Sequence, residues 1–201
     1  MGLKKYIASQ FAKPHGIGGK LACFAMNKMN KEMWRYLERQ IKNDTTVLDI
    51  GFGNGFVLKR LLKRTNSNFF GIDISADMVK TATKKNHKAV KQGRLALTQS
   101  SIENIPFDKQ FGQIYTMNTV YFWDDLQTAL NEVYNKLQAG GEFLNVFRNK
   151  EWLDKKAGFT KYGFKKYTEQ ELLTATEKAG FKCKLATISP NTFCIHAEKF
   201  K

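Results

Sequence analysis

The chain has few cysteines, and none of them lies in a recognisable metal or redox motif. Only Cys23, Cys183 and Cys194 occur among its 201 residues, and their spacing fits neither a metal-binding set nor a redox pair. An odd number of scattered cysteines is typical of a reducing compartment, so we expect buried thiols and a cytoplasmic location. The sequence predicts no metal site.

Long apolar segments, internal repeats and low-complexity segments are also lacking. No apolar run is long enough to cross a bilayer, and the stretch from Gly2 to Lys20 mixes charges with glycines, unlike a secretory signal. We therefore expect no transmembrane segment and no leader. Hydrophobic residues make up 42% of the chain, enough for one sizeable core rather than two full domains.

Acidic residues are scarce relative to basic ones. The 33 lysines and arginines outnumber the 18 acidic residues, which gives a formal net charge of +15. A strong positive charge favours anionic partners such as nucleic acid or a membrane surface. Many of these residues, however, fall on the expected outer faces of helices, and no arginine-rich tail or RNA-binding motif is present. We favour solubility as the explanation and keep a nucleic-acid partner as the alternative.

A glycine-rich turn between two apolar stretches is the most informative motif. The β-favouring run 47–50 enters Gly51-Phe52-Gly53-Asn54-Gly55. Apolar residues at helical spacing follow at once, namely Phe56, Val57, Leu58, Leu61 and Leu62. The pattern predicts strand, tight turn and helix, the first half of a βαβ unit, with a ligand lying directly against the glycine backbone.

The residues around this turn exclude two common phosphate-binding motifs. Phe56 stands where a dinucleotide fingerprint needs its third glycine, and the Gly-Lys-Ser/Thr ending of a P-loop is absent. A second carboxylate, Asp73, ends the next apolar run about 20 residues later, where it can bind two ribose hydroxyls. Asp49, just before the turn, is placed to hold the turn or a cationic group of the ligand.

The turn, Asp49 and Asp73 together resemble the first two motifs of the class I S-adenosylmethionine (SAM) dependent methyltransferases. The resemblance implies an α/β fold: a Rossmann-like, mostly parallel seven-stranded sheet flanked by helices, with its last strand antiparallel. It also implies SAM as cofactor and S-adenosylhomocysteine as product. The cofactor-binding residues it predicts are Asp49, Gly51, Phe52, Gly53, Gly55, Asp73, Ile74, Met78, Ser101, Ile102 and Asn118. Ser101 stands where such enzymes commonly carry an aspartate that accepts from the adenine amine.

Alternating apolar runs and helical patterns predict the remaining elements. We expect strands at 47–50, 69–74, 95–98, 113–118, after Gly141, at 183–188 and at 193–197. Helices are expected at 20–40, after the glycine turn, after Ser75, at 125–137 and after the capping box at Thr168. Residues 1–40 are predicted to form an N-terminal lid or cap, 41–201 the methyltransferase domain, and 148–167 an insertion on the substrate side.

Aromatic residues predict where the methyl acceptor binds. Because ligands of open α/β sheets lie at the carboxyl ends of the strands, the stretch from Asn118 to Trp123 should border the reaction centre. The predicted substrate-binding residues are Tyr121, Phe122, Trp123, Phe159 and Tyr162. The methionine-rich helix before Gln40 either forms a lid over an apolar substrate or simply caps the sheet.

A general base is needed only for some acceptors. SAM is an activated methyl donor, so positioning and exclusion of water dominate the chemistry. His15, Tyr121 and Tyr162 are the candidate catalytic bases for an oxygen or acidic-carbon acceptor, whereas an amine or thiol needs none.

Three functions fit the sequence. The first is SAM-dependent methyl transfer to a small molecule, similar to the bacterial group that includes quinone-biosynthesis C-methyltransferases. The second is an rRNA or tRNA methyltransferase, which the net charge and the Asn118/Tyr121 pair favour. The third is a module that binds SAM without transferring methyl groups. The sequence leaves the acceptor and the oligomeric state open.

Overall fold

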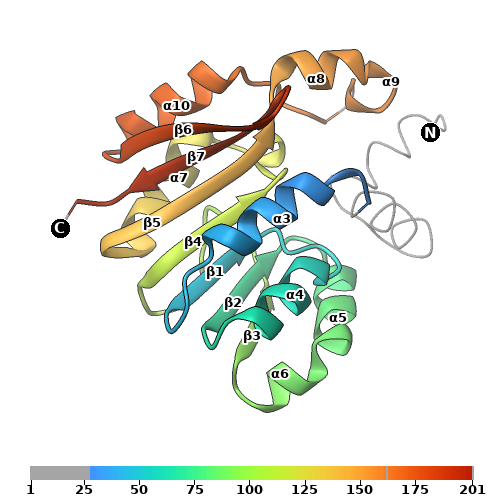
Figure 1. Cartoon of the computed structure of the whole chain (residues 1–201), viewed down its shortest axis with the longest axis vertical. Coiled ribbons are helices and arrows are strands. Elements are labelled where there is room, and N and C mark those ends of the chain that lie inside the picture. Colours follow the sequence, from blue (N-terminus) through green and yellow to red (C-terminus); the bar gives the residue numbers. More distant parts are fainter. Residues whose placement is uncertain (1–27, 162, 201) are drawn as a thin grey trace.

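A single seven-stranded sheet organises the molecule (Figure 1). The computed structural model describes residues 28–161 and 163–200. The strands are β1 (Thr46–Ile50), β2 (Asn68–Asp73), β3 (Leu95–Gln99), β4 (Phe111–Met117), β5 (Leu137–Arg148), β6 (Lys182–Ser189) and β7 (Thr192–Glu198). They lie in the order β3-β2-β1-β4-β5-β7-β6.

The strand directions confirm the predicted fold. The pairs β3–β2, β2–β1, β1–β4 and β4–β5 are parallel, and β7 is antiparallel to both of its neighbours, β5 and β6. From β1 the chain continues outward to β2 and β3, then returns to place β4 on the other side of β1. The carboxyl ends of β1 and β4 therefore flank the point where the strand order reverses, which is where open α/β sheets bind ligands.

Helices cover both faces of the sheet. α3 (Lys31–Gln40) precedes β1, and the elements between the strands are α4 (Phe56–Arg64), α5 (Ala76–Lys85), α6 (His87–Lys91), η1 (Val120–Phe122), α7 (Leu126–Lys136), α8 (Lys150–Lys155), α9 (Ala157–Thr160) and α10 (Glu169–Lys178). Successive strand residues point to opposite faces, so Val47 packs with α3, α4 and α5 whereas Leu48 packs with α7 and α10. In Figure 1, α3 and α4 lie in front of the sheet and α7 lies behind it.

Side-chain caps fix where several helices begin, although α3 and α4 begin without one. The Ser75 hydroxyl accepts from the Met78 amide at the start of α5, and the Asp125 carboxylate accepts from the Thr128 amide at the start of α7. The predicted capping box of Thr168 and Glu171 is formed at the start of α10. Polar residues before each apolar pattern thus set the helix boundaries locally, which is why the sequence locates these helices correctly.

The strands agree with the predicted ones to within two residues at each end, except that β5 begins earlier. β5 begins at Leu137, not after Gly141, because Leu137 pairs with Phe111 before a bulge brings Glu142 opposite Gln113. β4 ends at Met117, one residue earlier than predicted. Asn118 follows with a positive φ of 58°, which takes it out of the strand.

The described part of the N-terminal segment is held against the sheet. Met33 and Leu37 of α3 are fully buried, and Glu32 accepts from the Arg148 guanidinium at 3.1 Å. Tyr36 is hydrogen-bonded to His196 on β7 at 2.7 Å. Residues 28–40 therefore cap the sheet. The predicted lid role of the segment before them lies outside the described residues and stays a prediction.

The segment 148–167 contains two short helices, α8 and α9, where the sequence predicts only an insertion.

Within the part of the chain that the structure describes, no helix has the length and apolar character needed to span a bilayer. Cys183 and Cys194 are both free thiols; Cys194 is fully buried, as expected, whereas Cys183 is only partly buried.

Candidate active site

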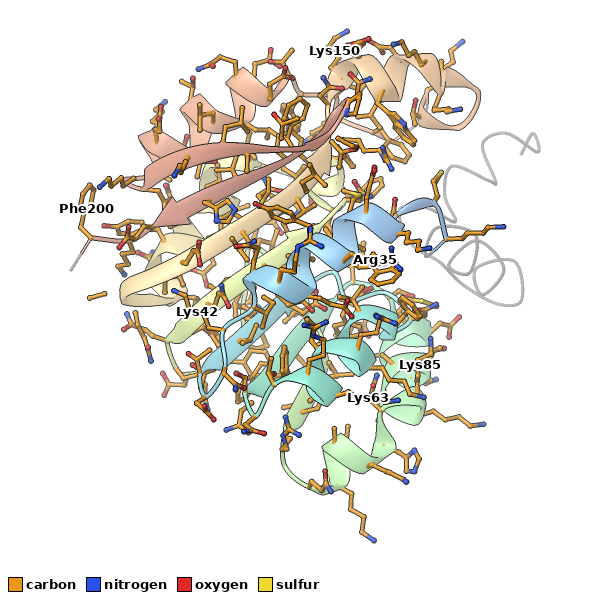
Figure 2. All side chains as sticks on the ribbon, in the orientation of Figure 1. Arg35, Lys42, Lys63, Lys85, Lys150 and Phe200 are labelled. Carbon is orange, nitrogen blue, oxygen red and sulfur yellow. The ribbon has the colours of Figure 1, made fainter. Side chains whose placement is uncertain are left out.

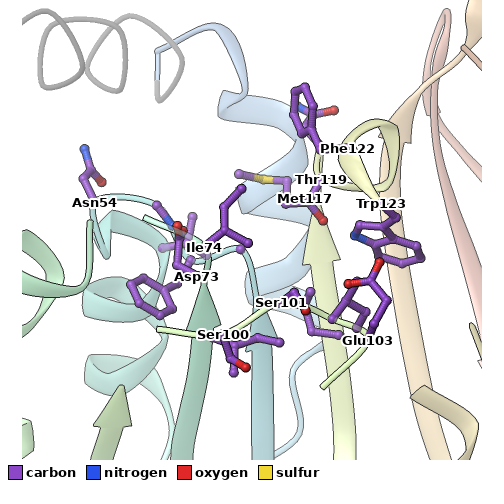
Figure 3. Close-up of a pocket in the computed structure, with 18 of the residues that line it drawn as sticks. Asn54, Asp73, Ile74, Ser100, Ser101, Glu103, Met117, Thr119, Phe122 and Trp123 are labelled. Carbon is purple, nitrogen blue, oxygen red and sulfur yellow. The ribbon is translucent and has the colours of Figure 1, made fainter. Parts of the chain in front are cut away.

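A cavity of about 300 Å³ opens at the carboxyl ends of β1, β2 and β4 (Figure 3). One end lies against the glycine turn and Asp73, and the other against the segment that follows β4. The lining residues are Asn30, Ile50, Gly51, Phe52, Gly53, Asn54, Phe56, Val57, Ile72, Asp73, Ile74, Ser100, Ser101, Ile102, Glu103, Met117, Asn118, Thr119, Phe122, Trp123 and Asp124. The cavity therefore sits at the point where the strand order reverses.

The glycine turn requires positive φ at three positions. Gly51, Gly53 and Gly55 have φ values of 77°, 53° and 68°, a region that other residues rarely adopt. A Cβ on Gly51 would lie 2.3 Å from Cγ2 of Thr119, whereas a Cβ on Gly53 would meet no protein atom within 4 Å. The backbone at Gly53 thus borders open space in the cavity, where a ligand can approach it directly.

Asp73 is the carboxylate that faces this end of the cavity. Its Oδ2 accepts from the Gly53 amide at 2.8 Å and its Oδ1 from the Ser75 amide at 2.9 Å. These two bonds fix the carboxylate, and each oxygen keeps further lone pairs for a ligand. Burial raises the pKa of Asp73, while the two amide bonds partly oppose that shift. Hydroxyl groups that donate to Asp73 would stabilise its charged form further.

Asp49 lies beneath the turn and does not line the cavity. Its Oδ2 accepts from the Tyr115 hydroxyl on the neighbouring strand at 2.5 Å, and its side chain is almost fully buried. Burial raises the pKa of Asp49 to about 8, the Tyr115 bond lowers it, and the charge of Asp73 raises it. The side chain therefore keeps its proton at neutral pH and supports the turn from below.

This raised pKa predicts how stability depends on pH. Between about pH 4 and 8 the folded chain holds a proton on Asp49 that the unfolded chain releases, so the free energy of unfolding falls as pH rises. In Asp49→Asn the amide stays neutral and still accepts from Tyr115. We expect this variant to be more stable than the wild type, by a margin about 2 kcal/mol larger at pH 8 than at pH 6.

Urea unfolding of both proteins across this pH range measures the effect. Asp108→Asn is the matched control, because Asp108 is exposed and lies outside the cavity. The control should show no pH-dependent margin over the wild type. An Asp49→Asn margin that stays constant from pH 6 to pH 8 would contradict the raised pKa.

Comparisons with known proteins agree with this geometry. A family model described as "Methyltransferase domain" matches residues 47–141, which contain the glycine turn, Asp73 and the strands around the cavity. Residues 47–141 therefore match a methyltransferase domain, and with the glycine turn and Asp73 they support the resemblance to the class I SAM-dependent methyltransferases.

Known relatives and structures resemble this chain over different lengths. It is 28% identical to the uncharacterized methyltransferase YdaC of Bacillus subtilis over 120 residues, covering 59% of this chain and 64% of YdaC. It is 27% identical over 150 residues to the ubiquinone/menaquinone biosynthesis C-methyltransferase UbiE of Rickettsia felis, covering 71% of this chain and 59% of UbiE. The chain thus spans less than two thirds of the length of either relative.

A solved structure matches the fold over the whole chain. It is a putative methyltransferase of Haloferax volcanii in complex with the Trm112 methyltransferase activator, with a TM-score of 0.79, 16% identity and full coverage of both chains. At this identity the match concerns the fold.

The cofactor end of the methyltransferase cavity suits SAM. The side-chain-free backbone at Gly53 leaves room for the amino-acid part of the donor, and Asp73 offers acceptors to the ribose hydroxyls. Ile74, directly after Asp73, is 40% exposed, unusual for an isoleucine beside a cavity, and an adenine ring could cover it. Ser101 and Ile102 also line the cavity.

Three of the predicted cofactor-binding residues do not line the cavity. Asp49 is buried under the turn. Gly55, which directly precedes α4, packs against Ala82 of α5. Met78 on α5 is 1% exposed and belongs to the core between helices and sheet. The other predicted cofactor residues, Gly51, Phe52, Gly53, Asp73, Ile74, Ser101, Ile102 and Asn118, all line the cavity.

The segment after β4 forms the other end of the methyltransferase cavity. Asn118 donates from Nδ2 to the Met33 sulfur at 3.2 Å and accepts at Oδ1 from the Tyr121 hydroxyl at 3.0 Å. Phe122 and Trp123 line the cavity, as predicted for substrate contact, whereas Tyr121 does not.

The structure places Tyr121 in the core of the methyltransferase. Its side chain is 2% exposed, and its hydroxyl bonds to both the amide and the carbonyl of Arg148. Burial raises the pKa of Tyr121, so its hydroxyl is poorly suited to remove a proton. Tyr121 is therefore suited neither to act as a base nor to contact the substrate. His15 and Tyr162 lie outside the described residues, as does the side chain of Phe159.

Several residues that line this cavity are not among the predicted site residues, although Thr119 belongs to the stretch expected to border the reaction centre. Asn30 comes from the segment before α3, Thr119 lies against Gly51, and Glu103 and Asp124 meet through a hydrogen bond from the Asp124 amide to Glu103 Oε1. Glu103 and Asp124 each lie within two residues of a predicted site residue, which was the available signal. Among the described residues, no three His, Cys, Asp or Glu side chains gather as a metal site requires.

Proposed function

We propose that the protein is an enzyme that transfers the methyl group of SAM to a small-molecule acceptor and releases S-adenosylhomocysteine. The observation that carries this proposal is the continuity of one cavity. The same space of about 300 Å³ touches Gly53 and Asp73 at one end and Phe122 and Trp123 at the other. A donor bound at the first end and an acceptor bound at the second would therefore be in direct contact within one cavity.

The charges around the cavity support an acceptor that is not an anion. All titratable side chains that line it in the described part of the chain are carboxylates, namely Asp73, Glu103 and Asp124. No lysine or arginine among the described residues lines the cavity, although the chain has a net charge of +15. A phosphate or carboxylate on the acceptor would find no described cation there, so a neutral or cationic small molecule fits better.

The residues of this chain contribute position and exclusion of water. SAM itself supplies an activated methyl group on its sulfonium. Asp73 would hold the ribose, and the buried Trp123 closes one wall against solvent. The described carboxylates beside Trp123 are Glu103 and Asp124, which could accept a proton from an acceptor; an amine or thiol acceptor needs no base, and His15 remains the sequence-based candidate.

A nucleic-acid acceptor is the second candidate, because a group of cations lies away from the cavity. Lys63 on α4 and Lys85 on α5 belong to it (Figure 2). Its other lysines on these helices and on α6 are Lys59, Lys80, Lys84, Lys88 and Lys91. These lysines could attract a phosphate backbone, but ordinary solvation of the helices explains them equally well.

Two measurements test the proposal. Calorimetric titration should show binding of both SAM and S-adenosylhomocysteine. Incubation with methyl-labelled SAM and a cell extract should then place the label in the small-molecule fraction and form S-adenosylhomocysteine. Label in RNA instead would favour the second candidate, and binding without turnover in any fraction would favour a SAM-binding module. Absence of binding would reject all three.

A further inference from the structure

The side chain of Asn30 is buried but is not used by the helix that it begins. Asn30 stands directly before α3, where a polar side chain commonly caps the first turn, yet it makes no capping hydrogen bond. It is 6% exposed, and its buried Oδ1 has no hydrogen-bond partner among the described residues. A buried acceptor without a partner is costly. Because Asn30 lines the cavity, a molecule bound there can supply the missing donor.

Two contacts place Asn30 at the methyl-acceptor end of the cavity. The carbonyl of the preceding residue, Met29, accepts from the guanidinium of Arg148, the last residue of β5, at 3.2 Å. Met33, one helical turn after Asn30, accepts at its sulfur from Nδ2 of Asn118, which directly follows β4. β4 and β5 lie on the other side of β1 from β2, the strand that ends in the carboxylate expected to hold the ribose. Asn30 therefore belongs to the methyl-acceptor side.

The other polar side chains toward this end mostly offer hydrogen-bond acceptors. Asn118 Oδ1 accepts one hydrogen bond and keeps a further lone pair, and the carboxylates of Glu103 and Asp124 line the same cavity. No lysine or arginine in the described ranges 28–161 and 163–200 lines it. The rings of Phe122 and Trp123 add faces that attract a positive charge. These groups fit an amine, which can donate from several N–H groups, better than an alcohol or thiol with a single donor.

We propose that the methyl acceptor is a primary or secondary amine and that Asn30 Oδ1 accepts a hydrogen bond from its nitrogen. This inference rests on the proposed function, because it names the acceptor class of the same reaction. The neutral nitrogen attacks the methyl carbon with its lone pair, and the bond between that carbon and sulfur breaks. The electron pair of the broken bond stays on sulfur, which gives S-adenosylhomocysteine, and the methylated nitrogen then releases a proton to water. An N–H held by Asn30 leaves the lone pair free to face the methyl group.

The first test identifies the methylated atom. The protein is incubated with methyl-labelled SAM and the small-molecule fraction of a cell extract, and mass analysis locates the label in the purified product. We expect the label on nitrogen, in a product that a cation-exchange column retains. Label on oxygen, sulfur or carbon overturns the inference and leaves the proposed function standing. Absence of label from every small molecule rejects the proposed function itself.

The second test measures what Asn30 contributes to acceptor binding. Asn30→Leu removes the accepting oxygen, so the concentration of the extract fraction that gives half the maximal rate should rise at least about threefold, with SAM affinity unchanged. Asn30→Asp keeps an accepting oxygen but adds a negative charge, which stabilises the protonated amine. Because only the neutral nitrogen can attack, the rise of the rate with pH should shift upward by about one unit or more.

Asn135→Leu and Asn135→Asp are the matched controls, because Asn135 is exposed on α7 and does not line the cavity. Both should match the wild type in rate and in pH profile. A wild-type half-saturating concentration in Asn30→Leu overturns the inference, and so does an unshifted pH profile in Asn30→Asp. If Asn30→Leu does not fold, the pH profile of Asn30→Asp decides alone.

Discussion

Asp73→Ala is expected to weaken SAM binding by about a hundredfold or more, because two ribose hydroxyls lose a charged acceptor and each such bond contributes about 1.5–3 kcal/mol. The carboxylate is already oriented by the amides of Gly53 and Ser75, so the donor meets an acceptor that needs no rearrangement. Calorimetric titration with SAM measures the loss.

Two further variants separate recognition from folding. Alanine also leaves the two backbone amides without their partner, so thermal unfolding must show that the variant is folded at the temperature of the titration. Asp73→Asn keeps one accepting oxygen and should lose less affinity than alanine does. Asp108→Ala, on an exposed residue outside the cavity, should bind SAM like the wild type. Wild-type affinity in Asp73→Ala would mean that the ribose is held elsewhere.

The features that the sequence predicted well are those decided by neighbouring residues. The glycine turn, the caps at Ser75 and Thr168, and the alternation of strands and helices depend on local backbone preference and apolar period. Asp73 follows from the same logic, because the last residue of a buried parallel strand reaches the carboxyl edge of the sheet.

The features that the sequence did not predict depend on register and on contacts between distant segments. The bond between Asp49 and Tyr115 requires β1 and β4 to pair at those two residues, which no local pattern specifies. In the same way, the 3-10 turn η1 directs Tyr121 into the core and leaves Phe122 at the cavity. The sequence does not distinguish these positions, because three aromatic residues follow one another from Tyr121 to Trp123.

Gly51→Ala is expected to lower the free energy of unfolding by about 4 kcal/mol, through a strained positive φ and a steric clash. Gly51 has a φ of 77°, and its new Cβ would lie 2.3 Å from Cγ2 of Thr119, a contact that no side chain can tolerate without moving the backbone. Gly93→Ala separates the two causes, because Gly93 has a similar φ of 72° but nothing within 4 Å of an added Cβ. It should cost only about 1 kcal/mol.

Removing the clashing methyl group should restore much of the lost stability. Thr119→Ser deletes Cγ2 and keeps the hydroxyl that bonds to Thr116, so the pair Gly51→Ala and Thr119→Ser should recover about 2 kcal/mol relative to Gly51→Ala alone. Urea unfolding of the single and double variants measures this coupling. Because the added Cβ points toward Thr119 rather than toward Asp73, the double variant should also bind SAM. Equal costs for Gly51→Ala and Gly93→Ala, with no coupling to Thr119, would show that the segment after β4 does not pack on the glycine turn.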